Sequence, residues 1–136
     1  MKKFELIEHT ADIGLVAYGK NLAEAFANAA RGMFSIIAGL DNVQEAELRR
    51  VEISADDIAG LLFEWLNSLL YYFDVEALLF SRFDITGFED TRLVAVCRGE
   101  KYDPSRHHLK TGVKSATYHM MEVDRQKNRV RVIFDI

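Results

Sequence analysis

The chain has 136 residues, of which 49% are hydrophobic and 28% are charged, and its formal net charge is −4. This length fits one domain with a real hydrophobic core over residues 1–136, and the composition excludes a disordered chain. The negative charge argues against a broad basic surface that would hold nucleic-acid phosphates without sequence preference.

The single cysteine, Cys97, ends the apolar run 93–97, which indicates a small buried side chain and not a reactive thiol. One cysteine cannot form an internal disulfide, so we expect a reducing, cytoplasmic compartment. Residues 1–8 contain no apolar signal core, and no run of about 18 apolar residues predicts a membrane span.

The start of the chain predicts two strands followed by an amphipathic helix. Strand patterns cover residues 4–8 and 15–18. The helix, over 22–37, has apolar residues at spacings of three and four, with Asn21 at the N-cap position and Gly39 at its end.

A second helix shows the strongest apolar periodicity in the sequence, over 58–73. Residues 54–57 are expected to cap it and to place acid in its first turn. Burial of its apolar face and the entropy cost of ordering it are of similar size, so this helix needs a sheet to lie against. Residues 43–53, just before it, predict an exposed strand or a strand with a bulge.

The second half of the chain predicts a series of strands joined by short turns. The predicted strands cover 78–85, 92–98, 114–123 and 129–136. Residues 86–90 and 124–128 are the predicted turns. In 114–123 the side chains should alternate, with Tyr118 on one face and His119 on the other. Two amphipathic helices packed on antiparallel or mixed sheets make an α+β fold.

Polar residues interrupt the first strand pattern, where an acid, an imidazole, a hydroxyl and a second acid fall within five positions. These are Glu8, His9, Thr10 and Asp12, and Gly14 closes the stretch. A strand whose side chains serve only to pack and stabilise the sheet would carry β-branched or aromatic residues at these positions. The stretch is therefore either a functional site or a solvated turn that Thr10 or Asp12 caps.

A further carboxylate, Asp135, stands near the end of the last predicted strand. If it met Asp12, two charges about 4 Å apart would repel by about 4 kcal/mol at an effective dielectric near 20, so the pair would hold a cation, share a proton or recruit a lysine. Oxygen ligands favour Ca²⁺ or Mg²⁺ over Zn²⁺. The alternative is that Asp135 is a solvated acid. Lys114 could neutralise the pair or contact phosphate, or it could merely block edge pairing.

The histidines are too scattered for a zinc signature, and His9 could simply orient its turn. Residues 106–110, which include His107 and His108, could contact RNA phosphates or be only solvated. The sequence has no glycine-rich phosphate loop, no nucleophile elbow and no Cys/His arrangement with recognisable spacing.

Several separated motifs carry a resemblance to a known family, at 4–14, 21–26, 61–66, 99–103, 114–119 and 132–136. In this order, and over essentially the whole length, they resemble the archease family. Two residues depart from its pattern. Gly112 stands where an acidic residue is common, and Ser115 replaces the usual alanine.

The resemblance implies a cofactor of RtcB-type RNA ligases, which act in tRNA splicing and RNA repair. Archeases promote guanylylation of the ligase's active-site histidine and allow repeated turnover, and they are not known as enzymes. We therefore expect an RtcB-type ligase as the direct partner and tRNA or other RNA only as an indirect partner, and no membrane partner is implied.

The same resemblance places a metal site at Asp12, Asp135 and the main-chain oxygens of Ile136, and a residue for activation of the partner at Lys114. We expect a divalent cation, foremost calcium, with magnesium or manganese as alternatives, and we assign His9 to partner activation as well. A chaperone-like binding module is the main alternative function. A small metal-assisted hydrolase ranks last, because only His9 offers a general base.

Overall fold

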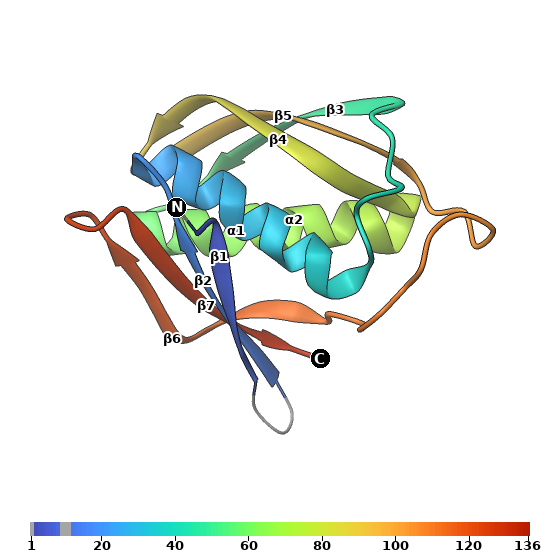
Figure 1. The fold of residues 1–136 in the computed structure, drawn as a ribbon. Helices are drawn as coiled ribbons and strands as arrows, with labels where there is room; N and C mark the ends of the chain where they lie inside the picture. Colours follow the sequence, from blue (N-terminus) through green and yellow to red (C-terminus); the bar gives the residue numbers. More distant parts are fainter. Residues whose placement is uncertain (1, 9–11) are drawn as a thin grey trace.

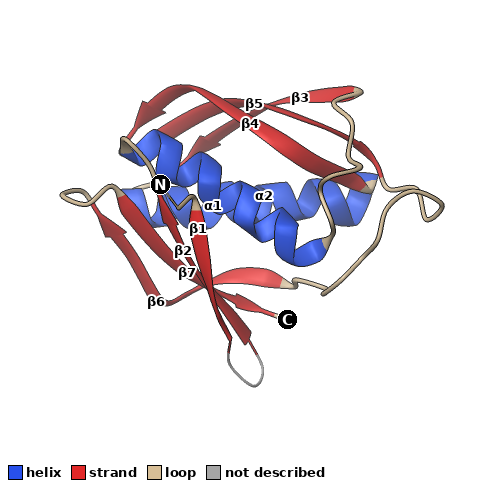
Figure 2. Ribbon diagram, viewed as in Figure 1, coloured by secondary structure: helices blue, strands red, loops and turns tan. Residues whose placement is uncertain are grey.

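Two helices lie between two antiparallel sheets, so the protein is a β–α–β sandwich (Figure 1, Figure 2). The structure is a computed structural model that describes residues 2–8 and 12–136. The helices are α1 (Leu22–Ile37) and α2 (Ile58–Glu76). This arrangement confirms the predicted α+β class.

The first sheet joins the two ends of the chain, with strand order β1-β2-β7-β6. Its strands are β1 (Phe4–Glu8), β2 (Asp12–Tyr18), β7 (Arg129–Asp135) and β6 (Ser115–Asp124). The second sheet has the order β3-β5-β4. Its strands are β3 (Glu47–Ser54), β5 (Arg92–Lys101) and β4 (Leu78–Glu89).

The predicted cap of α1 is confirmed. The Asn21 side chain accepts a hydrogen bond from the Glu24 backbone N–H at 2.8 Å, and the Lys20 backbone N–H donates to the Glu24 carboxylate at 3.0 Å. The bond from Glu24 gives an acceptor to one of the backbone N–H groups that have no partner within the first turn of a helix, and the bond from Lys20 closes the chain just before the cap. The helix ends at Ile37, as predicted, and Ala38 is its C-cap in an extended conformation that bridges to Leu109.

Helix α2 begins after Asp57, whose side chain accepts from the Gly60 N–H at 2.7 Å. The expectation of acid in the first turn is wrong, because Asp56 and Asp57 precede the helix. The fully buried Trp65 donates its indole N–H to the Phe26 carbonyl at 3.0 Å, which ties α2 to α1 through the centre of the core. A buried indole without such a partner would cost stability, so this bond fixes how the helices cross.

Several details of the strands differ from the sequence prediction. Strand β2 begins at Asp12 and not at residue 15, and β5 continues to Lys101 and not only to residue 98. Strand β4 continues to Glu89, so the turn before β5 is shorter than the predicted 86–90. Strand β3 pairs with β5 in unbroken register. Of the two predicted forms, an exposed strand or a strand with a bulge, it is therefore the regular strand. In β6 the pairing with β7 shifts between Thr117 and Glu122, where Met120 has a φ of 54°, so the predicted alternation fails there.

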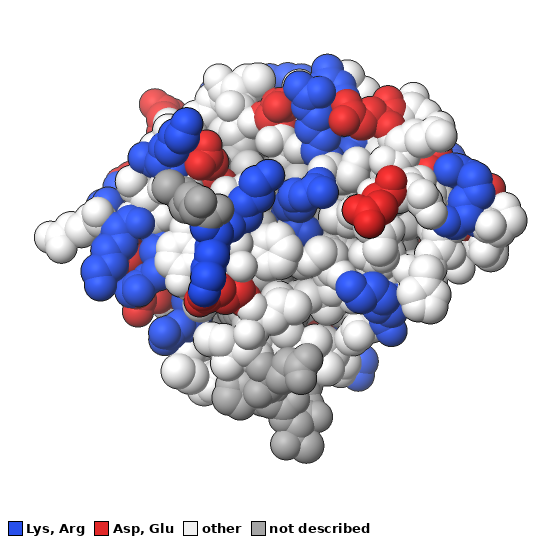
Figure 3. Space-filling view, viewed as in Figure 1, with Lys and Arg blue, Asp and Glu red and all other residues white. Residues whose placement is uncertain are grey.

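Cys97 is fully buried, and burial raises the pKa of its thiol to about 12. This confirms the prediction of an unreactive packing residue. Neither α1 nor α2, the helices of the described part of the chain, is long and apolar enough to cross a membrane. On the face drawn in Figure 3, lysine and arginine side chains are interspersed with carboxylates.

Candidate metal site

The pairing of β2 with β7 brings the beginning and the end of the sequence together. In the antiparallel register, Asp12 lies directly opposite Asp135. Buried side chains on the inner face of the sheet, among them Leu15, Val132 and Phe134, fix this register, because a slip by one residue would turn them toward solvent. The hydrophobic pattern of the two strands therefore holds the two carboxylates across from each other.

One oxygen of Asp12 lacks a partner. Its Oδ1 atom is buried and has no hydrogen bond among the residues that the structure describes. A buried carboxylate oxygen without a donor is costly, by roughly 1 to 3 kcal/mol or more. Such an atom is a ready ligand for a cation, which would supply the missing positive charge.

Asp135 is flanked on its other side by Ser115. The register of β6 and β7 pairs Ser115 with Asp135, and the Ser115 hydroxyl lies 3.5 Å from the Asp135 Oδ2 atom. The backbone N–H of Lys114 donates to the Asp135 carbonyl at 2.8 Å. Asp12, Asp135 and Ser115 thus form one row across three strands, with exposed Lys114 beside it.

The donor set of this row fits a hard cation. All its side-chain donors are oxygens, which suit Ca²⁺, Mg²⁺ or Mn²⁺. Within residues 2–8 and 12–136, His, Cys, Asp and Glu form no cluster of three or more that could hold a metal ion. The two carboxylates supply fewer oxygens than the six to eight that calcium takes, so main-chain oxygens, water or a partner would complete the shell.

Two further residues, Ile136 and His9, are predicted to take part in the site. Ile136 follows β7 directly and packs, half-buried, against the core, so its main chain lies next to Asp135. His9, and Thr10 with it, lie outside the described residues. The predicted role of His9 stays a prediction.

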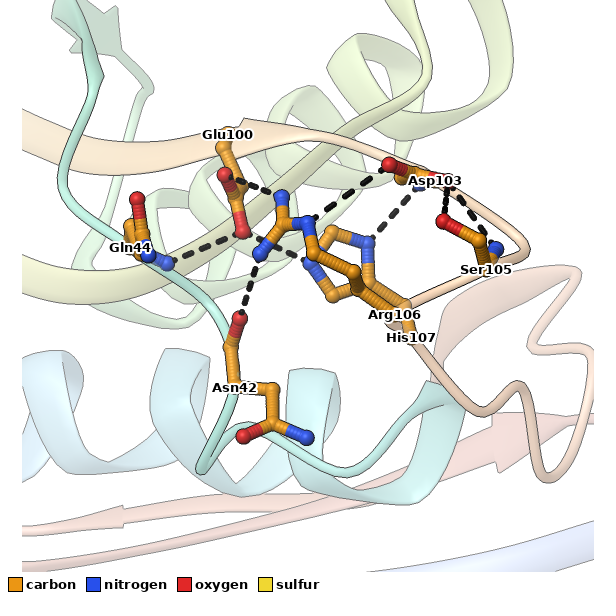
Figure 4. A network of polar contacts seen from close by, with 7 residues as sticks. All are labelled: Asn42, Gln44, Glu100, Asp103, Ser105, Arg106 and His107. Atoms are coloured by element: carbon orange, nitrogen blue, oxygen red, sulfur yellow. Dashed lines mark hydrogen bonds and ion pairs between the residues drawn. The ribbon is translucent and has the colours of Figure 1, made fainter.

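A second polar cluster, which sequence reasoning missed, lies in the loop after β5 (Figure 4). Glu100 is buried, and its carboxylate accepts from the Gln44 backbone N–H at 3.1 Å and contacts His107 Nε2 at 2.7 Å. Arg106 lies 2.7 Å from the other Glu100 oxygen. The hydrogen bond with Arg106 is the main reason why the pKa of Glu100 falls to about 2.

His107 is oriented from both sides of its ring. Its Nδ1 atom accepts from the Asp103 backbone N–H at 2.9 Å, so the proton of the neutral ring is on Nε2, where it is donated to Glu100. Through Glu100 and Arg106, which bond to the backbone of Gln44 and Asn42, the cluster holds the loop over residues 103–107 against the segment before β3. The suggestion that this loop is free to contact RNA does not hold for Arg106 and His107, which are engaged internally.

The fold and the acidic row define a class of small α+β proteins in which two helices lie between two antiparallel sheets. A comparison with known families matches residues 4–136 to the archease protein family. The solution structure of protein 1598 from Methanobacterium thermoautotrophicum is similar, with a TM-score of 0.82 at 39% identity over 100% of each chain. The chain belongs to the archease family.

Other relatives agree with this assignment. Protein archease of Sulfurisphaera tokodaii is 45% identical over 129 residues, which cover 94% of this chain and 93% of the relative. Protein archease of Pyrococcus abyssi is 40% identical, with coverage of 92% and 90%. The crystal structure of an archease, possible chaperone, from Thermotoga maritima shares the fold, with a TM-score of 0.61 at 21% identity over 96% and 94% of the two chains.

Proposed function

We propose that this protein is an activator of an RtcB-type RNA ligase in tRNA splicing and RNA repair, and not itself an enzyme. It promotes guanylylation of the ligase's active-site histidine and so permits repeated turnover. The observation that carries the proposal is the pairing of Asp12 with Asp135, together with the unpartnered buried Oδ1 atom of Asp12.

The residues of the row have distinct roles in this proposal. Asp12 and Asp135 hold a divalent cation, foremost calcium, and the main chain of Ile136 contributes oxygen. The bound cation supplies positive charge that attracts the phosphates of a nucleotide in the ligase. Lys114, whose side chain is exposed beside the row, adds a second cation toward the same phosphates. His9, which belongs to the same polar stretch of the sequence as Asp12, contacts the ligase.

The proposal is tested by the guanylylation of a purified RtcB-type ligase with radiolabelled GTP, in the presence and absence of this protein. Asp12→Ala and Asp135→Ala proteins should leave the ligase at its unassisted rate, because the cation is lost. Asp41→Ala is the matched control, since Asp41 is an exposed aspartate before β3, away from the row. If folded Asp12→Ala and Asp135→Ala proteins activate as well as the parent, the acidic row has no part in activation.

A second function, as a chaperone-like binding module, is favoured by one observation. Tyr71 and Val75 are 62% and 61% exposed and lie one turn apart on α2, and Tyr118 and Met120 on β6 are exposed as well. Exposed apolar side chains of this size are typical of interaction surfaces. This function predicts that the protein suppresses the aggregation of unfolded clients in EDTA, and that Asp135→Ala suppresses it equally well.

A further inference from the structure

Strand β3 is a long sheet edge that nothing in the described chain covers. It forms one border of its sheet and pairs only with β5, over eight residues in regular register. In an antiparallel pair, every second residue of an edge strand turns its N–H and C=O away from the partner strand. Among the described residues, the one further bond to the β3 backbone is local, from the Arg49 guanidinium to the Leu48 carbonyl.

The edge of β6, unlike that of β3, is partly covered by a side chain of α2. The side-chain amide of Asn67 accepts from the Ala116 N–H at 2.8 Å and donates to the Ala116 carbonyl at 3.3 Å, as a neighbouring strand would do. The following residues of β6 are bulged. This edge is therefore closed to a further strand.

The other two edges are less suited to pairing than β3. Strand β4 contains two register shifts, and Arg31 donates to the carbonyl of its residue Ser81. Strand β1 has only five residues. Because β3 is both regular and uncovered, it is the edge that can accept a further strand.

A groove runs along β3 on the side of α2. Its volume is about 490 Å³, and residues 51–53 of β3 line one wall. Glu64, Tyr71 and Glu76 of α2 lie along the other wall. A second hollow of about 350 Å³ shares Glu64 with the first and extends it toward Asp56 at the start of α2. A strand edge beside a helix is the arrangement in which extended peptides bind by strand addition.

The lining of these two hollows is negative. Neither is lined by a lysine or an arginine, while Glu52, Glu64 and Glu76 line the first and Asp56 and Asp57 the second. Arg49 pairs with Glu76, and Arg92 pairs with Glu52.

Glu64 and Asp56 take part in no ion pair within the described part of the chain. The pKa of the Tyr118 hydroxyl is raised, first by partial desolvation of the hydroxyl and then by the charges of Glu64, Asp57 and Asp56. Glu64, at the junction of the two hollows, is thus an uncompensated carboxylate in the middle of a negative groove.

We propose that the groove between β3 and α2 binds an extended segment of a partner protein that carries lysine or arginine side chains, and that this segment adds to β3 as a fourth strand. Main-chain hydrogen bonds to β3 would supply affinity, and alternate side chains would reach the groove. Charge complementarity selects a basic segment, with Glu64 as its main contact and Tyr71 as an aromatic face for a cation.

The probe is a capped eight-residue peptide of alternating lysine and valine, labelled with fluorescein and titrated with the full chain by fluorescence anisotropy. We expect saturable binding that weakens with salt, and amide chemical-shift changes confined to β3 and to residues 64–76. Glu64→Lys should weaken binding about fivefold or more, because it puts a like charge in the groove. Glu89→Lys, at the exposed end of β4, should change it less than about twofold.

Two further peptides separate strand addition from simple charge attraction. A peptide with glutamate in place of lysine should not bind, and one with alternate amides N-methylated should lose binding although its charge is intact. The proposal is overturned if the N-methylated peptide binds as well as the parent peptide, if Glu64→Lys binds like Glu89→Lys, or if the shift changes fall elsewhere. A lysine peptide that shows no saturable binding overturns it as well.

Discussion

Ser115, which the sequence resemblance marks as a departure from the expected alanine, places a hydroxyl 3.5 Å from Asp135 Oδ2 at the proposed metal site. A hydroxyl at this position can steady the carboxylate that faces Asp12. We therefore predict that Ser115→Ala weakens calcium binding, measured by isothermal titration calorimetry, by up to about tenfold.

The control for this prediction is Ser54→Ala, which removes an exposed hydroxyl at the end of β3. Both proteins should keep the parent's unfolding free energy to within about 0.5 kcal/mol, since neither side chain packs in the core. Equal calcium affinity of Ser115→Ala and the parent would show that Ser115 does not orient Asp135.

The buried Glu100 makes stability depend on pH. Its pKa in the folded protein is about 2, against an ordinary value of 4.5, so its charged form stabilises the fold at pH above about 4.5. This contribution is lost as the pH falls from about 4.5 through about 2. Glu100→Gln should reduce the free energy of unfolding in urea by about 2 kcal/mol at pH 7, because Arg106 loses its charged partner.

The difference between Glu100→Gln and the parent should then shrink as the pH falls from 4.5 toward 2. Glu52→Gln is the comparison on the surface, where the ion pair of Glu52 with Arg92 is exposed and the change should be small. If the difference in unfolding free energy between the parent and Glu100→Gln stayed constant from pH 7 to pH 2, the assigned pKa of Glu100 would be contradicted.

Single residues show where sequence reasoning reaches its limit. Asp12 and Asp135 could be found because a carboxylate is out of place in a strand pattern. The cluster around Glu100 could not, since its carboxylate accepts from the backbone of Gln44, far away in the sequence, and no periodicity signals that contact. A charged loop with two histidines gives the same local signal whether its side chains are exposed or buried.

At the scale of elements, the contact between β4 and β5 depends on a residue without a side chain. A Cβ atom on Gly99 would lie 1.9 Å from the Leu79 carbonyl oxygen and 2.7 Å from the Phe80 Cα atom, both of them backbone. Gly99→Ala should therefore force the strands apart and lower the unfolding free energy by about 3 kcal/mol or more, measured by urea or thermal unfolding.

Gly112→Ala is the matched control, because a Cβ atom there meets nothing within 4 Å. It should change stability by less than about 0.5 kcal/mol. A Gly99→Ala protein as stable as Gly112→Ala would mean that β4 and β5 approach less closely at Gly99 than described.

The elements differ in how far local pattern determines them. Both helices and the Asn21 cap were predictable, since helical periodicity and capping are local. The bulge in β6 and the extension of β4 to Glu89 were not, because strand register is chosen by the partner strand. Met120 lies in the stretch 118–121, which has no register partner on β7, and its positive φ is not signalled by its own propensity.

At the scale of the whole molecule, the fold brings two distant parts of the sequence together at the proposed metal site. β2 and β7 each bury one face, and their pairing carries Asp12 and Asp135 to one corner of the first sheet. Composition and periodicity predicted the strands but not which strand pairs with which. The resemblance to archeases, carried by motifs at both ends of the chain, was the only sequence signal for that convergence.

The central claim is that this corner holds a divalent cation, and thermal unfolding with and without calcium tests it most directly. Calcium at 100 times its Kd should stabilise the parent by about 2.7 kcal/mol, which is about 10 °C in Tm for a domain of this size. Asp12→Asn and Asp135→Asn should lose that shift. In EDTA they should melt at or above the parent, since the repulsion between the two carboxylates is relieved. A parent whose Tm does not respond to calcium, magnesium or manganese, or Asn variants that respond as the parent does, would contradict the account.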